Sequence, residues 1–227
     1  MKPYLPARTL ALSTLLCVLA LAANAHAASL TVSGWTLGEY VDIANGADTG
    51  SVPTAELNVT IGGVSGYAYC VDLAQSIGVG TTTGWRAMSA DANDQIIRAA
   101  WLVDTFHPTF DSAPLLRKTE IAALQVSLWE VMGESSGPYD LFSGAFALTP
   151  GGASSGVINL ANSMLTSLGG ADLSGYDPSA IWAVSMSYQD QLVFPPRVNP
   201  IPEPGTVGLY AFGALIAALG LKKKAAR

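Results

Sequence analysis

Two apolar segments, one near each end of the 227-residue chain, confine any globular fold to the residues between them. Near the N-terminus, an apolar run at residues 10–21 follows two basic residues and precedes small residues suited to signal cleavage. Because this run is too short to span a bilayer, we predict a signal peptide over residues 1–27, with a retained membrane anchor as the alternative. Removal of the signal would take Cys17 with it and leave Cys70 as the one cysteine of the exported chain.

The second apolar segment occupies residues 206–221, between a Pro-rich linker at residues 195–205 and a basic tail at residues 222–227. As a helix it would reach about 24 Å, slightly less than a hydrocarbon core of about 30 Å, and snorkelling lysines can bridge that difference. Basic residues beside a membrane span tend to stay in the cytoplasm, so the body of the chain should face outward. The sequence therefore predicts a single C-terminal transmembrane helix.

The linker places Pro202, Glu203 and Pro204 just before this helix. The order of Pro-Glu-Pro motif, apolar helix and basic tail resembles the PEP-CTERM sorting signal of Gram-negative bacteria. This resemblance implies an inner-membrane precursor, cleavage near the motif by an exosortase-type membrane protease, and release to the cell surface or into a secreted matrix. A plain tail anchor is the alternative.

Charge and side-chain types narrow the function of the region between the two segments. All 17 acidic residues but only five of the 11 basic residues lie within residues 28–204, which gives this stretch a net charge of −12. Such a domain repels phosphate backbones, and no basic stripe offsets the repulsion, so the sequence argues against nucleic-acid binding. One histidine, His107, and one cysteine cannot furnish a closed zinc site without several carboxylates, so we expect no metal and no other cofactor.

The same region contains two kinds of pattern in separate blocks. Runs of β-branched and aromatic residues predict strands at residues 30–35, 57–61, 67–73 and 181–194. Apolar periodicity predicts helices at residues 91–106, with Asp91 as the N-cap, at residues 114–132 and at residues 157–168. Because strand and helix blocks segregate, we predict an α+β fold with a strand-rich N-terminal part, central helices and a return to strands. Residues 28–194 should form one extracellular domain of this kind.

Gln125 occupies an unusual position on the second predicted helix. It recurs with Ile121 and Leu128 at helical spacing, so we expect it to face the core. Burial of an unpartnered amide costs about 1–3 kcal/mol, so some other group must satisfy or consume it. Cys70 raises a similar question, because an unpaired thiol in an oxidising compartment is chemically labile.

Two short motifs around these residues resemble those of bacterial thioester domains. The first is Tyr69-Cys70-Val71 and the second is Leu124-Gln125-Val126-Ser127-Leu128-Trp129. The resemblance implies that the Cys70 sulfur attacks the Gln125 side-chain amide, ammonia leaves, and a buried thioester remains. An amine or hydroxyl of an extracellular polysaccharide or protein would then open the thioester, so that the chain attaches covalently, once, as an adhesin and not as an enzyme.

Neighbouring residues could support that bond. Strand alternation puts Asp72 on the same face as Cys70, where it could move protons, although a solvated or hydrogen-bonded carboxylate is the simpler interpretation. Trp129 lies one turn after Gln125 and could cover the bond as a lid. Trp101 and Trp129 fit core positions better than a sugar-binding platform.

Two other functions remain open at this stage. A hydrolase would pair Cys70 as nucleophile with His107 as base. A structural matrix or biofilm protein would keep Cys70 as an ordinary buried thiol and Gln125 hydrogen-bonded to the backbone, with no thioester.

Overall fold

The computed structural model describes residues 29–46, 48–84, 86–88, 93–134 and 137–194. The predicted signal peptide, Pro-rich linker, sorting helix and basic tail lie outside these residues, and so do Pro202, Glu203 and Pro204. Within the described residues, no helix has the length and apolar character needed to cross a bilayer.

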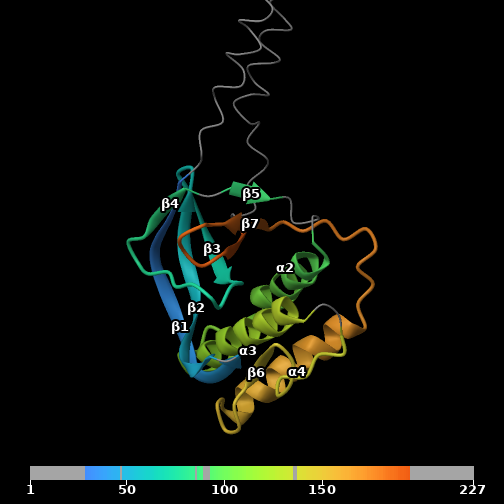
Figure 1. The fold of residues 1–227 in the computed structure, drawn as a ribbon. Coiled ribbons are helices and arrows are strands. Elements are labelled where there is room, and N and C mark those ends of the chain that lie inside the picture. The colour runs from blue at the N-terminus through green and yellow to red at the C-terminus, as the bar shows by residue number, and fades with distance from the viewer. Residues whose placement is uncertain (1–28, 47, 85, 89–92, 135–136, 195–227) are drawn as a thin grey trace, which may run out of the picture. The chain divides into compact units, whose positions relative to one another are not determined.

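The chain folds as an α+β domain, as the sequence predicts (Figure 1). The first strands are β1 (Ser29–Asn45), β2 (Asp48–Ile61), β3 (Val64–Cys70), β4 (Thr82–Gly84) and β5 (Arg86–Met88). There follow helix α2 (Asp94–Phe106), the short 3-10 helix η2 (His107–Thr109), helix α3 (Pro114–Gly133), strand β6 (Phe146–Leu148) and helix α4 (Ser155–Gly169). Strands β7 (Ile181–Val184) and β8 (Gln191–Phe194) come last.

The strands join in one antiparallel sheet whose order, over the described residues, is β4-β1-β2-β3-β8-β7-β5, with β6 paired to β1. Strand β8, which follows the helices in sequence, therefore returns to pair with β3, and β7 pairs with the other edge of β8. Cys70, the last residue of β3, is paired with Gln191, the first residue of β8. This pairing decides what surrounds the cysteine.

A two-glycine turn sets the register that leads to Cys70. Gly62 and Gly63 connect β2 to β3 with φ angles of 55° and 85°. Two successive residues with positive φ are the mark of a type I′ hairpin turn, which matches the twist of the flanking strands. The hairpin pairs Leu57 with Ala68, so that alternate residues of β3 point to opposite faces of the sheet.

Each face of the sheet has its own hydrophobic core. Tyr69 and Val71 belong to the larger core, which also contains the buried side chains of the three helices. Ala68 and Cys70 belong to a smaller core on the other face, together with Val193 and residues of β1 and β2. The predicted alternation along β3 is thus confirmed.

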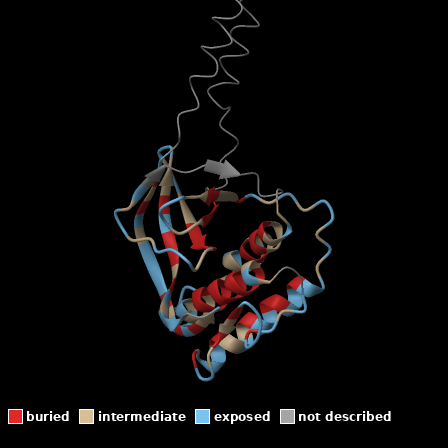
Figure 2. Cartoon of the chain, in the orientation of Figure 1, coloured by how far each residue is buried: buried red, intermediate tan, exposed pale blue. Residues whose placement is uncertain are grey.

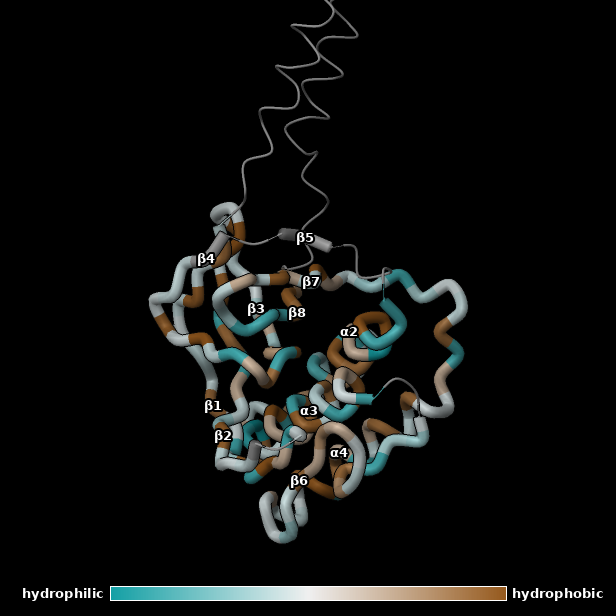
Figure 3. The backbone as a smooth tube through the Cα atoms, in the orientation of Figure 1, coloured by the Kyte–Doolittle hydropathy of each residue, from teal (hydrophilic) through white to brown (hydrophobic). Residues whose placement is uncertain are grey.

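Helix α3 begins with exposed turns and is enclosed from Ile121 to Val131. It packs against α2, α4, β1 and β2, and residues 121–131 are buried without interruption (Figures 1 and 2). Pro114 begins the helix, as predicted, and Gly133 is its last residue, one position beyond the predicted end at residue 132. In contrast, α4 shows both hydrophobic and hydrophilic residues along its length and buries one stripe (Figure 3). Polar side chains on an enclosed part of a helix need hydrogen-bond partners within the protein. In α3 these side chains are Gln125, Ser127 and Glu130.

Several predicted boundaries were wrong. Asn93 caps α2, because its side chain accepts a hydrogen bond from the Gln95 amide at 2.8 Å; Asp91 lies outside the described residues. Strand β1 is much longer than predicted and absorbs its glycines through register shifts. The predicted strand at residues 181–194 is two strands, which a turn separates; Asp190 stabilises this turn by accepting from the Ser185 amide at 2.8 Å.

Gly38 is one of these glycines, and it lies where β1 passes closest to α3. A Cβ atom at this position would come within 3.0 Å of the backbone nitrogen of Ala122 and of Ile121 Cγ2, and nearer still to Thr54 Oγ1. The backbone of Ala122 is fixed in the helix and cannot move aside. The absence of a side chain at Gly38 is therefore what allows the sheet and α3 to pack this closely.

We predict that Gly38→Ala destabilises the domain by about 1–3 kcal/mol, because the added methyl overpacks the contact with α3. Gly50→Ala in β2 is the matched control, since a Cβ there meets nothing within 4 Å. The measurement is the free energy of unfolding in urea. Equal stabilities of the two variants would contradict the close approach.

Candidate functional site

The structure places the Gln125 side chain against the backbone of Cys70, whereas the Cys70 thiol lies in the smaller core on the other face of the sheet. Gln125 is only 1% exposed, which confirms that it faces the core. Its side-chain Nε2 donates a hydrogen bond of 2.7 Å to the backbone oxygen of Cys70. The amide of α3 is therefore anchored on the residue that carries the one thiol of the described domain, at the end of β3.

The other end of the same amide is unpaired. Gln125 Oε1 is buried and has no hydrogen-bond partner. A buried acceptor without a donor costs about 1–3 kcal/mol. Such a cost in the middle of a core helix is difficult to explain for a residue with only a packing role, since an apolar side chain would avoid it.

The Cys70 thiol has a partner of its own, which the sequence did not reveal. Gln191 Nε2 lies 3.6 Å from Cys70 Sγ, and the thiol donates to Gln191 Oε1 at 3.8 Å. Gln191 is 2% exposed and belongs to a strand whose four residues are all buried. A polar residue within so apolar a strand indicates a buried polar contact, as Gln125 does in its helix. Its partner can be identified only once β8 is known to pair with β3.

The surroundings keep the thiol protonated at neutral pH. Burial raises the pKa of Cys70 to about 12; the hydrogen bond with Gln191 lowers it in part, and the charge of Asp72 raises it further. A thiol in this state reacts slowly with external reagents, because the thiolate is the reactive form. Unassisted reactivity toward solvent is therefore suppressed.

The predicted supporting residues have separate roles. Val71 and Leu128 lie in the larger core, and Trp129 packs there with its ring centroid 6.1 Å from that of Phe146. Asp72 Oδ1 accepts from the Ala74 amide at 2.7 Å, the hydrogen-bonded arrangement named above as the simpler interpretation. Its role in proton transfer and that of Trp129 as a lid stay predictions.

Tyr69 leads to a second polar cluster. Its hydroxyl donates to Glu56 Oε2 at 3.0 Å, and the same oxygen contacts His107 Nε2 at 2.6 Å and Arg117 Nη2 at 2.8 Å. The His107 ring also stacks on Tyr67, with centroids 4.0 Å apart. His107 thus pairs with a carboxylate in the larger core, whereas the thiol pairs with Gln191. Because His107 and the Cys70 thiol have different partners, the structure does not favour a hydrolase that pairs them.

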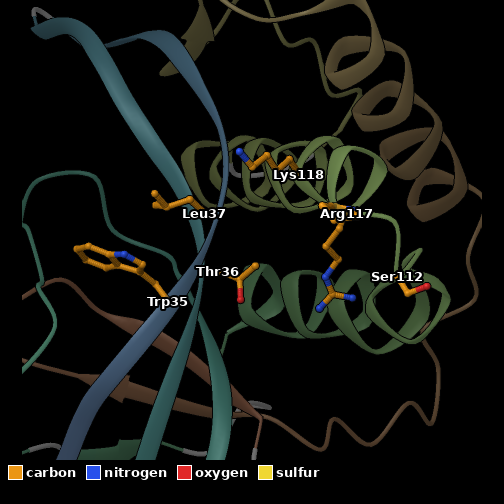
Figure 4. Close-up of a pocket in the computed structure, with 7 residues that line it drawn as sticks. Trp35, Thr36, Leu37, Ser112, Arg117 and Lys118 are labelled. Atoms are coloured by element: carbon orange, nitrogen blue, oxygen red, sulfur yellow. The ribbon is translucent and has the colours of Figure 1, made fainter.

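An open groove of about 580 Å³ lies between β1 and the start of α3 (Figure 4). Its lining consists of Trp35, Thr36, Leu37, Ser112, Pro114, Arg117 and Lys118. In Figure 4 the indole of Trp35 and the guanidinium of Arg117 extend to opposite sides of β1, and Arg117 is already held by Glu56. The two side chains do not converge on one ligand, so we assign no binding role to the groove.

Comparison of the chain with protein-family models, with curated proteins and with solved structures finds no match. The chemistry open to the site follows from its own residues. These are a buried amide with one free acceptor, a buried protonated thiol, and a second buried amide in contact with the sulfur.

The Glu56 cluster should make the stability of the domain depend on pH. Burial raises the pKa of Glu56, but the hydrogen bond and charge of His107, the charge of Arg117 and the Tyr69 hydroxyl together hold it below its ordinary value. A carboxyl with a lowered pKa stabilises the fold above its unfolded pKa of about 4.3 and loses this effect as the pH falls through the folded value.

We therefore expect Glu56→Gln to destabilise the protein by about 1.5–3 kcal/mol at neutral pH, and the deficit to shrink toward pH 3. Urea unfolding across this range measures it. Asp177→Asn removes an exposed carboxylate and serves as the control. A deficit that is constant with pH would show that the charge of Glu56 does not stabilise the cluster.

Proposed function

We propose that this chain is an exported protein that forms a thioester between Cys70 and Gln125 and uses it to attach covalently to extracellular polysaccharide or protein. The observation that carries the proposal is the 2.7 Å hydrogen bond between the buried Gln125 amide and the Cys70 backbone, together with the unpaired Gln125 Oε1. The buried helix and the strand hold the Gln125 amide against the Cys70 backbone, so only the thiol has to reorient before the bond forms.

The chemistry balances without a cofactor. The Cys70 sulfur forms a bond to Gln125 Cδ, the bond from Cδ to Nε2 breaks, and the departing NH₂ takes up the thiol proton and leaves as ammonia. In the second step, an external amine or hydroxyl forms a new bond to Cδ, the sulfur leaves, and it regains a proton as a thiol. One attachment consumes one thioester, so the protein acts once and does not turn over.

Burial supports both steps. A thioester survives only where water is excluded, and both residues are buried, Gln125 on the helix side of the sheet and Cys70 in the smaller core on the other face. A thioester oxygen is a weaker hydrogen-bond acceptor than an amide oxygen, so bond formation also relieves the unpaired Oε1. The sulfur has to turn from Gln191 toward Gln125 to react, and we place this rotation at the start of the reaction.

The ends of the chain supply the location. We propose that residues 1–27 direct export, that residues 206–221 form a transmembrane helix, and that an exosortase-type protease cleaves near Pro202, Glu203 and Pro204. The precursor would sit in the inner membrane with its acidic domain outside. Release would then deliver the domain to the cell surface or matrix, where amines and hydroxyls are abundant.

One observation favours a second candidate. The bond from Gln125 Nε2 to the Cys70 backbone satisfies half of the amide without any covalent link. A structural matrix protein with an ordinary buried cysteine would show the same contact. The two candidates differ in mass and in reactivity, which makes them separable by experiment.

We expect the secreted protein to weigh about 17 Da less than its sequence mass, because ammonia is lost when the thioester forms. Methylamine should then add one molecule, raise the mass about 14 Da above the sequence mass and expose one thiol. Cys70→Ala and Gln125→Ala should each abolish the deficit, whereas Gln75→Ala, at an exposed position, should retain it. Intact mass spectrometry measures all of these states.

Full sequence mass in fresh protein, unchanged by methylamine, would favour the structural matrix protein. Repeated turnover that stops in His107→Ala would instead favour a hydrolase. Consumption of a single equivalent is what the thioester predicts.

The tail makes an independent prediction. In a host with an exosortase, Glu203→Ala or deletion of residues 222–224 should leave uncleaved protein in the membrane fraction. Immunoblotting of membrane and secreted fractions measures this, with Pro195→Ala as a control outside the motif. Normal release of both altered chains would refute the sorting assignment while leaving the thioester untouched.

A further inference from the structure

The smaller core contains a polar contact between the Cys70 thiol and the side chain of Gln191. Cys70 and Gln191 face each other across the β3–β8 pair, and both side chains lie on the sheet face away from α3. Every other cross-strand partner of β3 in β8 is apolar: Leu192, Val193 and Phe194. The one polar pair of this ladder is the pair that holds the sulfur.

The orientation of the Gln191 amide is fixed by a second contact. Its Nε2 donates to the backbone oxygen of Gln189 at 2.9 Å, which directs the NH₂ group and leaves Oε1 to accept from the thiol. Gln189 in turn donates from its own Nε2 to the backbone oxygen of Asp72. The turn before β8 is therefore tied to the residues just after Cys70.

These contacts can stabilise the Cys70 sulfur after its bond to the carbonyl carbon of Gln125 has broken. When a thioester opens, negative charge develops on the sulfur, and within an apolar core an N–H donor is needed to stabilise it. Gln191 Nε2 can supply that donor at 3.6 Å, and Oε1 can accept the S–H bond once the sulfur is protonated. One carboxamide thus fits the sulfur in both protonation states.

We propose that Gln191 receives the Cys70 sulfur as it leaves Gln125, and so accelerates the opening of the thioester by the target. This inference rests on the proposed thioester and assigns Gln191 to its second step. No additional reactant is required: the target's amine or hydroxyl bonds to Gln125 Cδ, the sulfur leaves with the electron pair, and the target's proton ends on the sulfur beside Gln191.

The test compares Gln191→Met with the wild-type protein. Methionine keeps the length of the side chain and removes both polar atoms. The mass deficit of about 17 Da should persist, because Gln125 and Cys70 are intact, while the rate constant for opening by methylamine should fall about 10- to 100-fold. Gln191→Leu should behave alike, and Gln75→Met at an exposed position should open at the wild-type rate.

A spectroscopic measurement separates contact with the sulfur from a general effect on folding. In Gln125→Ala the thiol stays free, and its S–H stretching band should lie at lower wavenumber with Gln191 present than in Gln125→Ala/Gln191→Met. The exported chain has one cysteine, so the band is unique. A loss of packing alone would not shift this band in a folded variant.

The outcomes are distinct. A wild-type protein without the mass deficit overturns the proposed thioester, and the role of Gln191 with it. A deficit in both proteins with equal opening rates overturns the role of Gln191 alone. Loss of the deficit in folded Gln191→Met would also overturn it, and retention of the deficit in Gln125→Ala would identify Gln191 as the acyl donor.

Discussion

The burial of residues 121–131 of α3 requires partners for the polar side chains among them, and the domain supplies these partners in part, since Gln125 Oε1 and Glu130 Oε2 remain unpaired. Gln125 reaches the Cys70 backbone of β3, Ser127 donates to Ala123 of its own helix at 2.8 Å, and Glu130 Oε1 accepts from the Asp140 amide at 2.7 Å. The contacts of Gln125 and Glu130 fasten two separate segments to one helix. Burial raises the pKa of Glu130 to about 7. The hydrogen bond from the Asp140 amide lowers this pKa in part, and the charges of Glu134 and Asp140 raise it further. Polar burial thus fixes the geometry that apolar packing alone would leave adjustable.

The two faces of the sheet carry different polar contacts. On the helix side, Tyr69 joins a carboxylate cluster that connects β2, η2 and α3. On the other side, Cys70 meets Gln191 in a small apolar core. Because neighbouring residues of a strand point in opposite directions, one dipeptide contributes to stability on one face and to the proposed chemistry on the other.

The α+β class, the extent of α3 to within one residue and the core position of Gln125 could be predicted because they depend on local patterns, above all the helical period of apolar residues. The full length of β1 could not, since its register shifts around Gly34 and Gly38 depend on partners distant in sequence. The neighbour of the thiol was missed for the same reason. Gln191 shares no local pattern with Cys70, and only the return of β8 to β3 places them together. The Glu56 cluster likewise assembles from four elements that no spacing rule connects.

That return of β8 has a kinetic consequence. The Cys70–Gln191 pair spans 121 positions of the chain, and so distant a contact closes a large loop and forms slowly compared with hairpins and helices. The β1–β2–β3 meander and α3 can form from nearer contacts, so the sulfur gains its polar neighbour only when the C-terminal strands arrive. The polar environment of Cys70 is therefore complete only when β8 has paired with β3, and the reactivity of this residue reports whether that pairing has formed.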